Sequence, residues 1–561
     1  MASLQLNRRA MLGALGAGSA TLLLGNKGAA GALDTAYING RIWTGLNAVP
    51  LAGALGITGD RIACVGKAAT AARIGRATRV VDLKGAFVCP GFMDNHTHFL
   101  MGSQALVQVQ LLPVRTPQQL IETIGAFART LPAGKWLQGF GWDAERWGGE
   151  LPSRQWLDAV TPDTPVFVQR TDGHIALVNS LALRLAGIDR NTPQPVGGTI
   201  DKDAKGEPTG ILRDNAMDPV LAVIPPPGAG ETDAIMRRGI ELGLSRGLTQ
   251  VHNADMDWDV FESARRLRSH GETGLRFYNL APLKQWEKLA KLVREEGRGD
   301  DWVRWGGLKG MADGALGSRT ALMRQHYAND DKNFGFALQL LEQFRECVMG
   351  ADRAGLQVAV HAIGDAAIDK VLDIFAATSK ANGRRDRRFR IEHAQHIALD
   401  AVARFGREKV IACIHPYHAI DDGRWAGKVL NPDQLKGSWA TRSLLDGGAM
   451  VSFGSDWPVA PLDPLGGIEA AVLRRTTDGL QPAGFVPEQK ITAVEALSAY
   501  TLGNAYAGFQ EHKLGTIQPG KLADLTVLDQ NLLDCDPATI AATQVLRTVV
   551  GGRERFTASA A

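Results

Sequence analysis

Residues 86–98 read Ala-Phe-Val-Cys-Pro-Gly-Phe-Met-Asp-Asn-His-Thr-His, and this stretch decides the fold. An apolar run leads into two histidines separated by one residue, and polar residues gather where the run ends. In a β-strand, alternate side chains point to the same face. His96 and His98 therefore project together, as two imidazoles that share one metal must. The stretch predicts a buried strand whose end carries a metal site.

Further runs of the same kind follow along the chain. Lys309, His361 and His393 each close an apolar, strand-like run, and Phe453-Gly454-Ser455-Asp456 closes another. Catalytic residues at the carboxyl ends of strands are typical of a (β/α)8 barrel. We therefore expect an α/β fold built on a TIM-like barrel. Its eight strands are expected over, or ending at, residues 91–98, 248–255, 275–281, 303–309, His361, His393, His415 and Asp456.

The chain of 561 residues is longer than one ordinary domain. Both ends are rich in strand signals, with hairpin turns expected at Asn39-Gly40 and Gly59-Asp60. The stretch 105–215 is too long for a loop between a barrel strand and its helix. We expect an export signal at 1–32, a composite β-sandwich from 33–88 and 515–561, a barrel from 89–104 and 216–514, and an insertion subdomain at 105–215 over the active site.

The amino-terminal segment has the features of a targeting sequence. Arg8 and Arg9 precede an apolar run from Ala10 to Leu24, which at about 15 residues is too short to span a bilayer comfortably. Ala30-Gly31-Ala32 offers a cleavage site of small residues. The paired arginines resemble a twin-arginine signal. We expect a periplasmic or secreted protein with no membrane anchor after cleavage; the alternative is an uncleaved tail.

The overall charge indicates which partners to expect. The formal net charge is only +3 and no basic cluster occurs, which argues against a nucleic-acid partner. We expect a small-molecule substrate, and a homodimer stays open.

The strand-end residues together predict a metal centre. They follow the chain order HxH, Lys, His, His, Asp, which indicates a two-metal hydrolase. A single histidine at a strand end is often a hydrogen-bonded core residue, so only the joint pattern carries the prediction. Histidine and carboxylate ligands suit Zn²⁺, with iron, manganese and cobalt as alternatives. We expect one or two ions per chain, held by His96, His98, Lys309, His361, His393 and Asp456.

Lys309 is the unusual member of this set. A protonated amine has no lone pair and cannot bind a metal. Burial near metals lowers the pKa of a lysine, and the neutral amine can add carbon dioxide to give a carbamate with two oxygens. The alternative is a lysine that forms a salt bridge with Asp313 or Asp365.

Asp456 is the expected catalytic residue. It is placed to bind the first metal and to move protons, since a carboxylate beside a metal-bound water can accept its proton and deliver it to a leaving nitrogen. The alternative is a cap on the helix after the eighth strand.

Several side chains are expected on the substrate side. Arg319 lies in the loop after Lys309 and could hold a substrate carboxylate, or it could only brace the loop. His415 and His418 follow the seventh strand, and we expect substrate contacts rather than metal bonds. His252 and Asp255 on the second strand are expected around the site.

Six motifs resemble those of the amidohydrolase superfamily, and most closely its amidohydrolase 3 branch. They are PGFMDNHTH (90–98), KGMADGALGSRT (309–320), HAIGD (361–365), RIEHAQ (390–395), GSDWP (454–458) and GKLAD (520–524). The resemblance spans about residues 35–555. It implies a metal-dependent barrel with a composite β-sandwich.

The resemblance also implies roles for individual residues. His96, His98 and Asp456 match ligands of one metal, His361 and His393 match ligands of the other, and Lys309 matches a bridging carbamate. His174 lies in a stretch, DGHIALVN (172–179), that is similar to a substrate-side motif. Two residues depart from the pattern: similar proteins often have Gln at the position of His415, and Cys89 replaces an aliphatic residue.

These features predict a metal-dependent amidohydrolase. We expect hydrolysis of a non-peptide C–N bond in an N-acyl, formamide or cyclic amide compound, by metal-bound hydroxide with Asp456 as proton shuttle. Cleavage of an ester, lactone or phosphoester by the same metal site is one alternative. A non-catalytic exported binding protein of the same fold is another.

Overall fold

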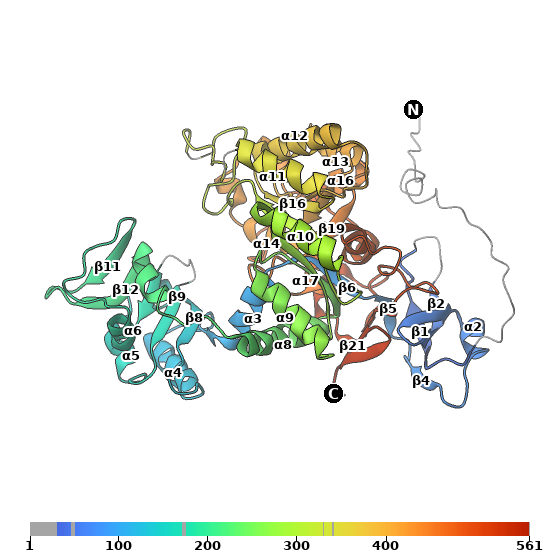
Figure 1. Ribbon diagram of the computed structural model, residues 1–561, viewed down its shortest axis with the longest axis horizontal. Coiled ribbons are helices and arrows are strands. Elements are labelled where there is room, and N and C mark those ends of the chain that lie inside the picture. Colours follow the sequence, from blue (N-terminus) through green and yellow to red (C-terminus); the bar gives the residue numbers. More distant parts are fainter. Residues whose placement is uncertain (1–30, 47–50, 171–174, 329, 339–340, 560–561) are drawn as a thin grey trace. The chain divides into compact units, whose positions relative to one another are not determined.

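A computed structural model describes residues 31–46, 51–170, 175–328, 330–338 and 341–559 (Figure 1). The predicted export signal falls almost wholly outside these residues, and so does His174. The chain forms two compact units, Met1–Phe99 with Ile240–Ala561, and Leu100–Gly239.

The first unit contains the predicted barrel. Its eight strands are parallel and run in the order β19-β18-β17-β16-β15-β14-β13-β6. All eight predicted strands are present. They are β6 (Phe92–Thr97), β13 (Leu248–Asn253), β14 (Arg276–Pro282), β15 (Val303–Met311), β16 (Gln357–Ala362), β17 (Arg390–His393), β18 (Ile411–Ile414) and β19 (Val451–Phe453).

The strand sequences explain their place in the interior. Every residue of β6, β13, β16, β17, β18 and β19 is buried. Strands of a parallel barrel are covered on both faces, by helices outside and by other strands inside. Most of these strands are therefore rich in apolar residues, whereas β13 and β17 also bury polar and charged side chains, which require partners in the interior.

Helices connect successive strands. The helices after barrel strands are α3 (Phe99–Val107), α9 (Trp258–Ser269), α10 (Trp286–Glu296), α11 (Leu341–Arg353), α12 (Asp365–Asn382), α13 (Val402–Glu408), α14 (Pro416–Asp422), α16 (Thr441–Asp446) and α17 (Pro464–Leu473), while α8 (Ala229–Ser245) precedes β13. In α11, Phe344, Val348 and Ala351 are buried at the spacing of one helix face. Within the described part of the chain, no helix combines the length and apolarity needed to cross a bilayer.

The barrel closes at the residues predicted to be functional. Its two edge strands, β6 and β19, are joined beyond the end of β19 by a parallel bridge between Thr97 and Trp457. The backbone N–H of Asp456 donates to the carbonyl of His96 at 2.8 Å, and that of His98 donates to Trp457 at 2.7 Å. The closing seam therefore fixes Asp456 against the two histidines.

The two ends of the chain share a second sheet. Its order is β22-β21-β20-β5-β1-β2-β3, with β4 paired to β1. Strand β5 pairs antiparallel with β20, which joins amino-terminal to carboxyl-terminal strands. The strands are β1 (Thr35–Ile42), β2 (Ala52–Thr58), β3 (Arg61–Val65), β4 (Arg79–Asp82), β5 (Phe87–Pro90), β20 (Leu525–Leu528), β21 (Val545–Val550) and β22 (Arg553–Thr557).

One of the two predicted hairpin turns is wrong. The turn at Gly59-Asp60 connects β2 and β3 as expected. Asn39-Gly40 instead lies inside β1, where the register with β2 shifts and Asn39 has φ 56°. Asn tolerates a positive φ at a bulge as well as in a tight turn, so the same dipeptide has produced a bulge.

The second unit, Leu100–Gly239, is built on a six-stranded sheet of order β11-β12-β10-β9-β8-β7. Its strands are β7 (Val109–Gln110), β8 (Leu137–Trp142), β9 (Val166–Arg170), β10 (Ile175–Val178), β11 (Gly198–Lys202) and β12 (Pro208–Asp214), and its main helices are α4 (Pro117–Ala128), α5 (Arg154–Asp158), α6 (Ser180–Leu185) and α7 (Asp218–Leu221). Trp142 is fully buried in its core. The position of this unit over the active site stays a prediction.

Candidate active site

The predicted site residues lie at the carboxyl ends of the barrel strands. His96 is the second-last residue of β6, and Lys309 and His361 lie near the ends of β15 and β16. His393 is the last residue of β17. His415 follows β18, and Asp456 lies three residues after β19.

The first group of close ligands is the predicted HxH motif with Asp456. Oδ1 of Asp456 lies 3.3 Å from Nε2 of His98 and 3.5 Å from Nε2 of His96. Nδ1 of His98 lies 3.7 Å from a carboxylate oxygen of Asp255. The two histidines thus direct their Nε2 atoms toward the same carboxylate oxygen.

Asp94 stabilises the arrangement of this group through hydrogen bonds to the backbone. Its side chain is buried, and it accepts hydrogen bonds from the backbone N–H of His96 at 3.0 Å and of Ser455 at 3.0 Å. Asp94 therefore ties the end of β6 to the loop that carries Asp456. Burial raises the pKa of Asp94 to about 7, against the lowering effect of these hydrogen bonds.

Glu392 fixes the orientation of His96. Its Oε2 accepts a hydrogen bond from Nδ1 of His96 at 2.5 Å. Arg390 donates to Oε1 of Glu392 at 2.7 Å and to the carbonyl of Asn95 at 2.7 Å, and all these side chains are buried. Because Nδ1 of His96 carries the donated proton, its Nε2 is left with a free lone pair facing the site.

Lys309 lies inside the same cluster. It is 2% exposed, and its Nζ is 3.1 Å from Nε2 of His96. Burial lowers the pKa of Lys309, which favours the neutral amine. The alternative salt bridge is absent among the described residues, because Asp313 accepts from the backbone of Leu322, Ile363 and Gly364, and Asp365 accepts from the backbone of Arg324 and Ala366.

His361 and His393 come from neighbouring strands. Their ring centroids are 4.4 Å apart. Nε2 of His361 lies 3.1 Å from the carbonyl of Gly314 and 3.7 Å from Oδ1 of Asp313. The loop after β15 therefore occupies one nitrogen of His361 and leaves Nδ1 for another partner.

His415 and His418 also reach the cluster. The ring of His415 lies 4.9 Å from that of His96 and 4.7 Å from that of His393. Nε2 of His418 lies 4.0 Å from Oδ2 of Asp456. Oδ2 of Asp456 is also 3.9 Å from Nδ1 of His393. Asp456 thus has His96 and His98 at one oxygen and His393 and His418 at the other.

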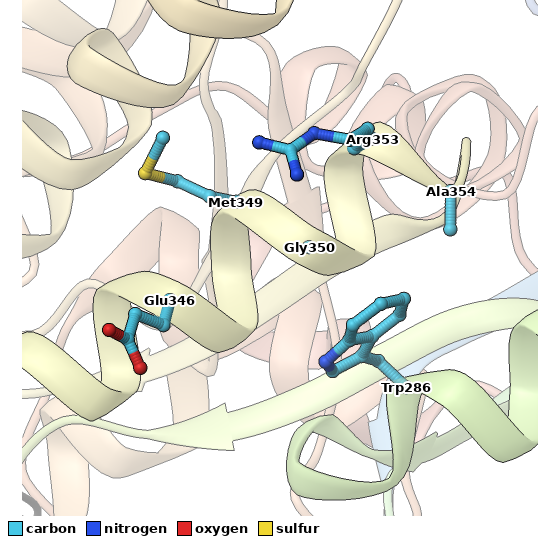
Figure 2. A pocket seen from close by; sticks show the side chains of 6 residues that line it. All are labelled: Trp286, Glu346, Met349, Gly350, Arg353 and Ala354. Carbon is cyan, nitrogen blue, oxygen red and sulfur yellow. The ribbon is translucent and has the colours of Figure 1, made fainter.

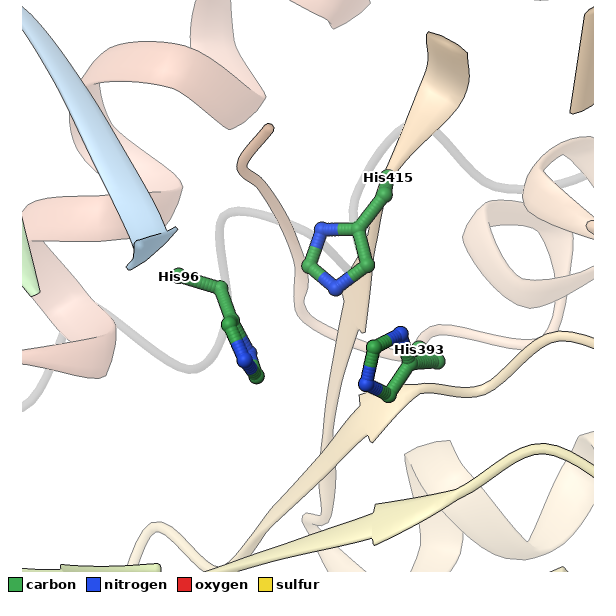
Figure 3. Close-up of side chains that lie close together, drawn as sticks. All are labelled: His96, His393 and His415. Atoms are coloured by element: carbon green, nitrogen blue, oxygen red, sulfur yellow. The ribbon is translucent and has the colours of Figure 1, made fainter. Parts of the chain in front are cut away.

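The described residues include three groups of three side chains, and within each group the possible metal-binding atoms lie within 4.8 Å of one another. They are His96, His98 and Asp456; His96, His393 and His415; and His393, His418 and Asp456. Figure 3 shows the second group, whose rings converge from the ends of three separate strands. His361 stands outside these groups, although its ring is next to that of His393.

The cluster contains atoms that need a partner. Among the described residues, Nδ1 of His393, both ring nitrogens of His415, Nε2 of His418 and Oδ1 of Asp456 are buried without a hydrogen bond. Buried polar atoms are nearly always paired. A cation that accepts these lone pairs therefore fits the site.

The charge states of His96, His361, His393 and His415 agree with this role. Burial lowers the pKa of His361 to about 4 and that of His415 to about 3, and it lowers the pKa of His96 and His393 well below the usual value. These imidazoles are neutral at pH 7, as metal ligands must be. For His98, burial acts the same way, but the nearby carboxylates of Asp255 and Asp456 outweigh it and raise its pKa to about 9.

Asp456 is ionised in this environment. Burial alone would raise its pKa, but the close imidazoles of His98, His96, His415 and His418 outweigh burial and hold the pKa well below its usual range. It does not cap the following helix, because the N-cap of α17 is Asp463.

The remaining predicted site residues are Arg319, His252 and Asp255, and their contacts differ. Arg319 is half-buried with φ 54°, and its guanidinium forms no ion pair within the described part of the chain. His252 is fully engaged, with Gln250 at 3.0 Å from one nitrogen and Arg390 at 3.1 Å from the other. His252 therefore contacts Arg390, the residue that donates to Glu392. Asp255 is placed to orient His98.

Asp94, Arg390 and Glu392 were missed as functional residues by sequence reasoning. A signal was present: Asp94 stands two residues before His96, and Arg390 and Glu392 share a face of a strand whose burial predicts apolar residues. Charged residues on such a face require partners in the interior.

A separate surface hollow of about 550 Å³ lies against α10 and α11 (Figure 2). It is lined by Trp286, Glu346, Met349, Gly350, Arg353 and Ala354. These side chains offer a single carboxylate and no imidazole, so the chemistry resides at the barrel end.

Comparison with known proteins agrees with this geometry. The model of the Amidohydrolase family matches residues 79–556. The protein LONG AFTER FAR-RED 3 of Arabidopsis thaliana is 37% identical over 539 residues, which cover 93% of this chain and 91% of that protein. The N-substituted formamide deformylase of Arthrobacter pascens is 30% identical over 528 residues, which cover 89% of this chain and 94% of that enzyme.

A solved structure shows the same fold. It is that of an uncharacterized metal-dependent hydrolase from Pyrococcus furiosus, with a TM-score of 0.76 and 29% identity, and the match covers 89% of this chain and 100% of that one. The chain belongs to the amidohydrolase family. It is a metal-dependent hydrolase that acts on carbon–nitrogen bonds, and its His/Asp cluster is able to bind the metal.

Proposed function

We propose that the protein hydrolyses a non-peptide C–N bond in a small N-acyl, formamide or cyclic amide compound. The observation that carries this proposal is the position of Asp456. Its ionised carboxylate is buried between His96 and His98 on one side and His393 and His418 on the other. A carboxylate so placed can both face a cation and exchange protons with a bound substrate.

The reaction consumes one water and moves one proton in two steps. The oxygen of water adds to the carbonyl carbon, and Asp456 accepts the proton that the water releases. When the C–N bond breaks, Asp456 returns this proton to the departing nitrogen. The products are a carboxylic acid and an amine, or one ring-opened molecule from a cyclic amide.

The chain holds the metal with its own side chains. His96, His98, His361, His393 and Asp456 are the proposed ligands, with Lys309 as a carbamate between two ions. When bound, the metal polarises the carbonyl and makes the water more acidic. Zinc is the proposed ion, since imidazole and carboxylate ligands suit it. Burial of Lys309 beside His96 supports the carbamate, because only the neutral amine can add carbon dioxide.

Further residues are proposed to contact the substrate. His418 lies 4.0 Å from Asp456, and Arg319, whose guanidinium forms no ion pair with the residues that the structure describes, is proposed to receive a substrate carboxylate. The proposed contact of His174 rests on sequence alone. The similarity to the N-substituted formamide deformylase supports formamides as the first compounds to test.

A substrate panel tests the proposal. Zinc-loaded protein is assayed with N-substituted formamides, N-acyl amines and cyclic amides beside matched esters, lactones and a phosphoester. We expect turnover of at least one amide class, with loss of activity in Asp456→Asn. Turnover confined to the oxygen esters would overturn the C–N assignment, and zinc binding without any turnover would favour a binding protein.

We further propose that the protein is exported folded, through a twin-arginine route. Arg8 and Arg9 before the apolar run support this. Replacement of both arginines by lysine should retain the protein in the cytoplasm, whereas Lys27→Arg in the same segment should not change its location. Equal distribution of all three forms would refute the route.

A further inference from the structure

The observation that leads furthest concerns His415, which was expected only to contact substrate. It is the first residue after β18 and is 1% exposed. Neither of its ring nitrogens has a hydrogen-bond partner among the described residues. A neutral imidazole carries one N–H donor and one lone pair. A buried imidazole whose N–H donor and lone pair are both unmatched is rare. The ring of His415 therefore needs a partner other than the described protein residues.

The neighbours of His415 indicate what that partner is. Its ring lies 4.9 Å from that of His96 and 4.7 Å from that of His393, and those two rings are 5.1 Å apart, so the three form a triangle (Figure 3). The ligand atoms of the three residues lie within 4.8 Å of one another. Nitrogens that share one zinc lie about 3.3 Å apart, since each Zn–N bond is about 2.0–2.1 Å. Small ring rotations therefore suffice to bring a nitrogen of His415 and one of His393 onto the same ion.

His96 cannot serve two ions. Its Nδ1 donates to Glu392, so only Nε2 is free, and one nitrogen lone pair makes one metal bond. That Nε2 lies 3.5 Å from Oδ1 of Asp456, the oxygen that also faces His98. His96 therefore belongs with His98 and Asp456.

A second ion must take its ligands from the remaining side chains. His393 has a free buried nitrogen, and His361 has one nitrogen occupied by the carbonyl of Gly314. Among the described residues, His415 and His418 are the imidazoles near His393 with unmatched buried nitrogens, and the ring of His415 is the nearer, at 4.7 Å against 6.2 Å. We propose that His415 is a direct ligand of the second metal ion, together with His393. This proposal rests on the metal-dependent function above and adds a ligand to its site.

The test measures metal uptake without substrate. Metal-free wild type and His415→Gln are titrated with Zn²⁺ in competition with a coloured chelator. The matched control is His396→Gln, a buried histidine whose ring bonds to Ser438 and Gln395 and lies outside the cluster. We expect two equivalents in the wild type and the control, and second-site binding at least about tenfold weaker in His415→Gln, since even residues behind the ligands affect affinity about 10–100-fold.

Other outcomes would overturn the assignment. Equal zinc affinity in all three proteins, equal weakening in both variants, or uptake of one zinc by the wild type would each do so. If His415→Gln fails to fold, a zinc-soaked wild-type crystal decides: a nitrogen of His415 at about 2.0–2.1 Å from anomalous density supports the proposal, and one beyond about 3 Å refutes it. Two bound zinc ions without amide hydrolysis would refute the proposed function but leave the ligand assignment standing.

Discussion

Glu392 accepts the Nδ1 proton of His96 at 2.5 Å, although the two residues lie 296 positions apart in the chain. The contact joins strands that are not neighbours in the barrel and leaves one defined nitrogen of His96 facing the site. Partners of this kind fix the ring orientation of metal-binding histidines.

Glu392→Gln should weaken metal binding. The amide can present its NH₂ group to His96, so the ring is no longer held in one tautomer, and we expect affinity to fall about 10–100-fold. Arg390 also loses its buried charge partner, so the midpoint temperature of thermal unfolding should fall. Zinc titrations of the variant should therefore be done well below that temperature. Unchanged zinc affinity in the folded variant would remove Glu392 from the site.

Removal of metal should abolish hydrolysis. A chelator that strips the protein should leave no turnover, and Zn²⁺, Co²⁺ or Mn²⁺ should restore it. Calcium is the control, because it prefers oxygen ligands over imidazole. Full activity in a sample shown to be metal-free by elemental analysis would contradict the family chemistry in this chain.

Asp456→Asn should reduce turnover about 10²–10⁴-fold, the usual loss when a general acid–base is removed. Substrate affinity should change less. Asp463→Asn is the matched control, because Asp463 lies seven residues further on, at the start of α17, and its side chain forms no cap hydrogen bond. Near-normal rates in Asp456→Asn would show that another group moves the proton.

Lys309→Ala should lose activity and part of its metal. Formate or acetate added to this variant should restore some of both, since a small carboxylate supplies the two oxygens of a carbamate. Lys309→Met keeps the space filled, so the acids should not help it. If Lys309→Ala retains full metal content and ignores added acids, the carbamate proposal fails.

Glu554 should make stability depend on pH. It accepts hydrogen bonds from Tyr37 at 3.1 Å, Arg79 at 2.8 Å and Arg547 at 2.9 Å. Burial would raise its pKa, but Arg79 and Arg547 outweigh burial and lower it. A carboxyl group whose pKa is lower in the folded state stabilises the protein at pH values above its pKa in the unfolded chain, about 4.3. This stabilisation is lost as the pH falls through the pKa of the folded state.

Glu554→Gln should therefore unfold more easily at pH 7, by roughly 1–2 kcal/mol, and the difference should shrink below about pH 4. Midpoints of urea unfolding across pH measure this. Glu342→Gln is the control, because that side chain is 73% exposed. A difference that is constant with pH would show that the ion pair does not act through charge.

The sequence predicted the barrel strands because their ends carry distinctive residues. Eight apolar runs end in polar or ligand residues, and the structure has a barrel strand at each. The strand-end histidines and Asp456 do lie together, since parallel strands in a barrel bring their carboxyl ends to one rim.

Glu392 could not be placed from strand alternation alone. Adjacent residues of a strand point to opposite faces, so Glu392 and His393 should diverge. His393 has φ 71° and Ala394 has φ 43°, so the chain turns sharply at the end of β17 and both side chains reach the cluster. A backbone turn of this kind leaves no periodic signal. The bulge at Asn39 was missed for a related reason, because Asn-Gly permits more than one conformation.

The pairing of β5 with β20 has a consequence for biosynthesis. The sheet shared by both ends needs residues 35–90 together with residues 525–557. A ribosome delivers these two parts at opposite ends of translation, so the early strands must wait, with their edges unpaired, until the last ones emerge. Native assembly is therefore completed only after synthesis is finished, and chaperones that shield open strand edges should associate with the nascent chain throughout that interval.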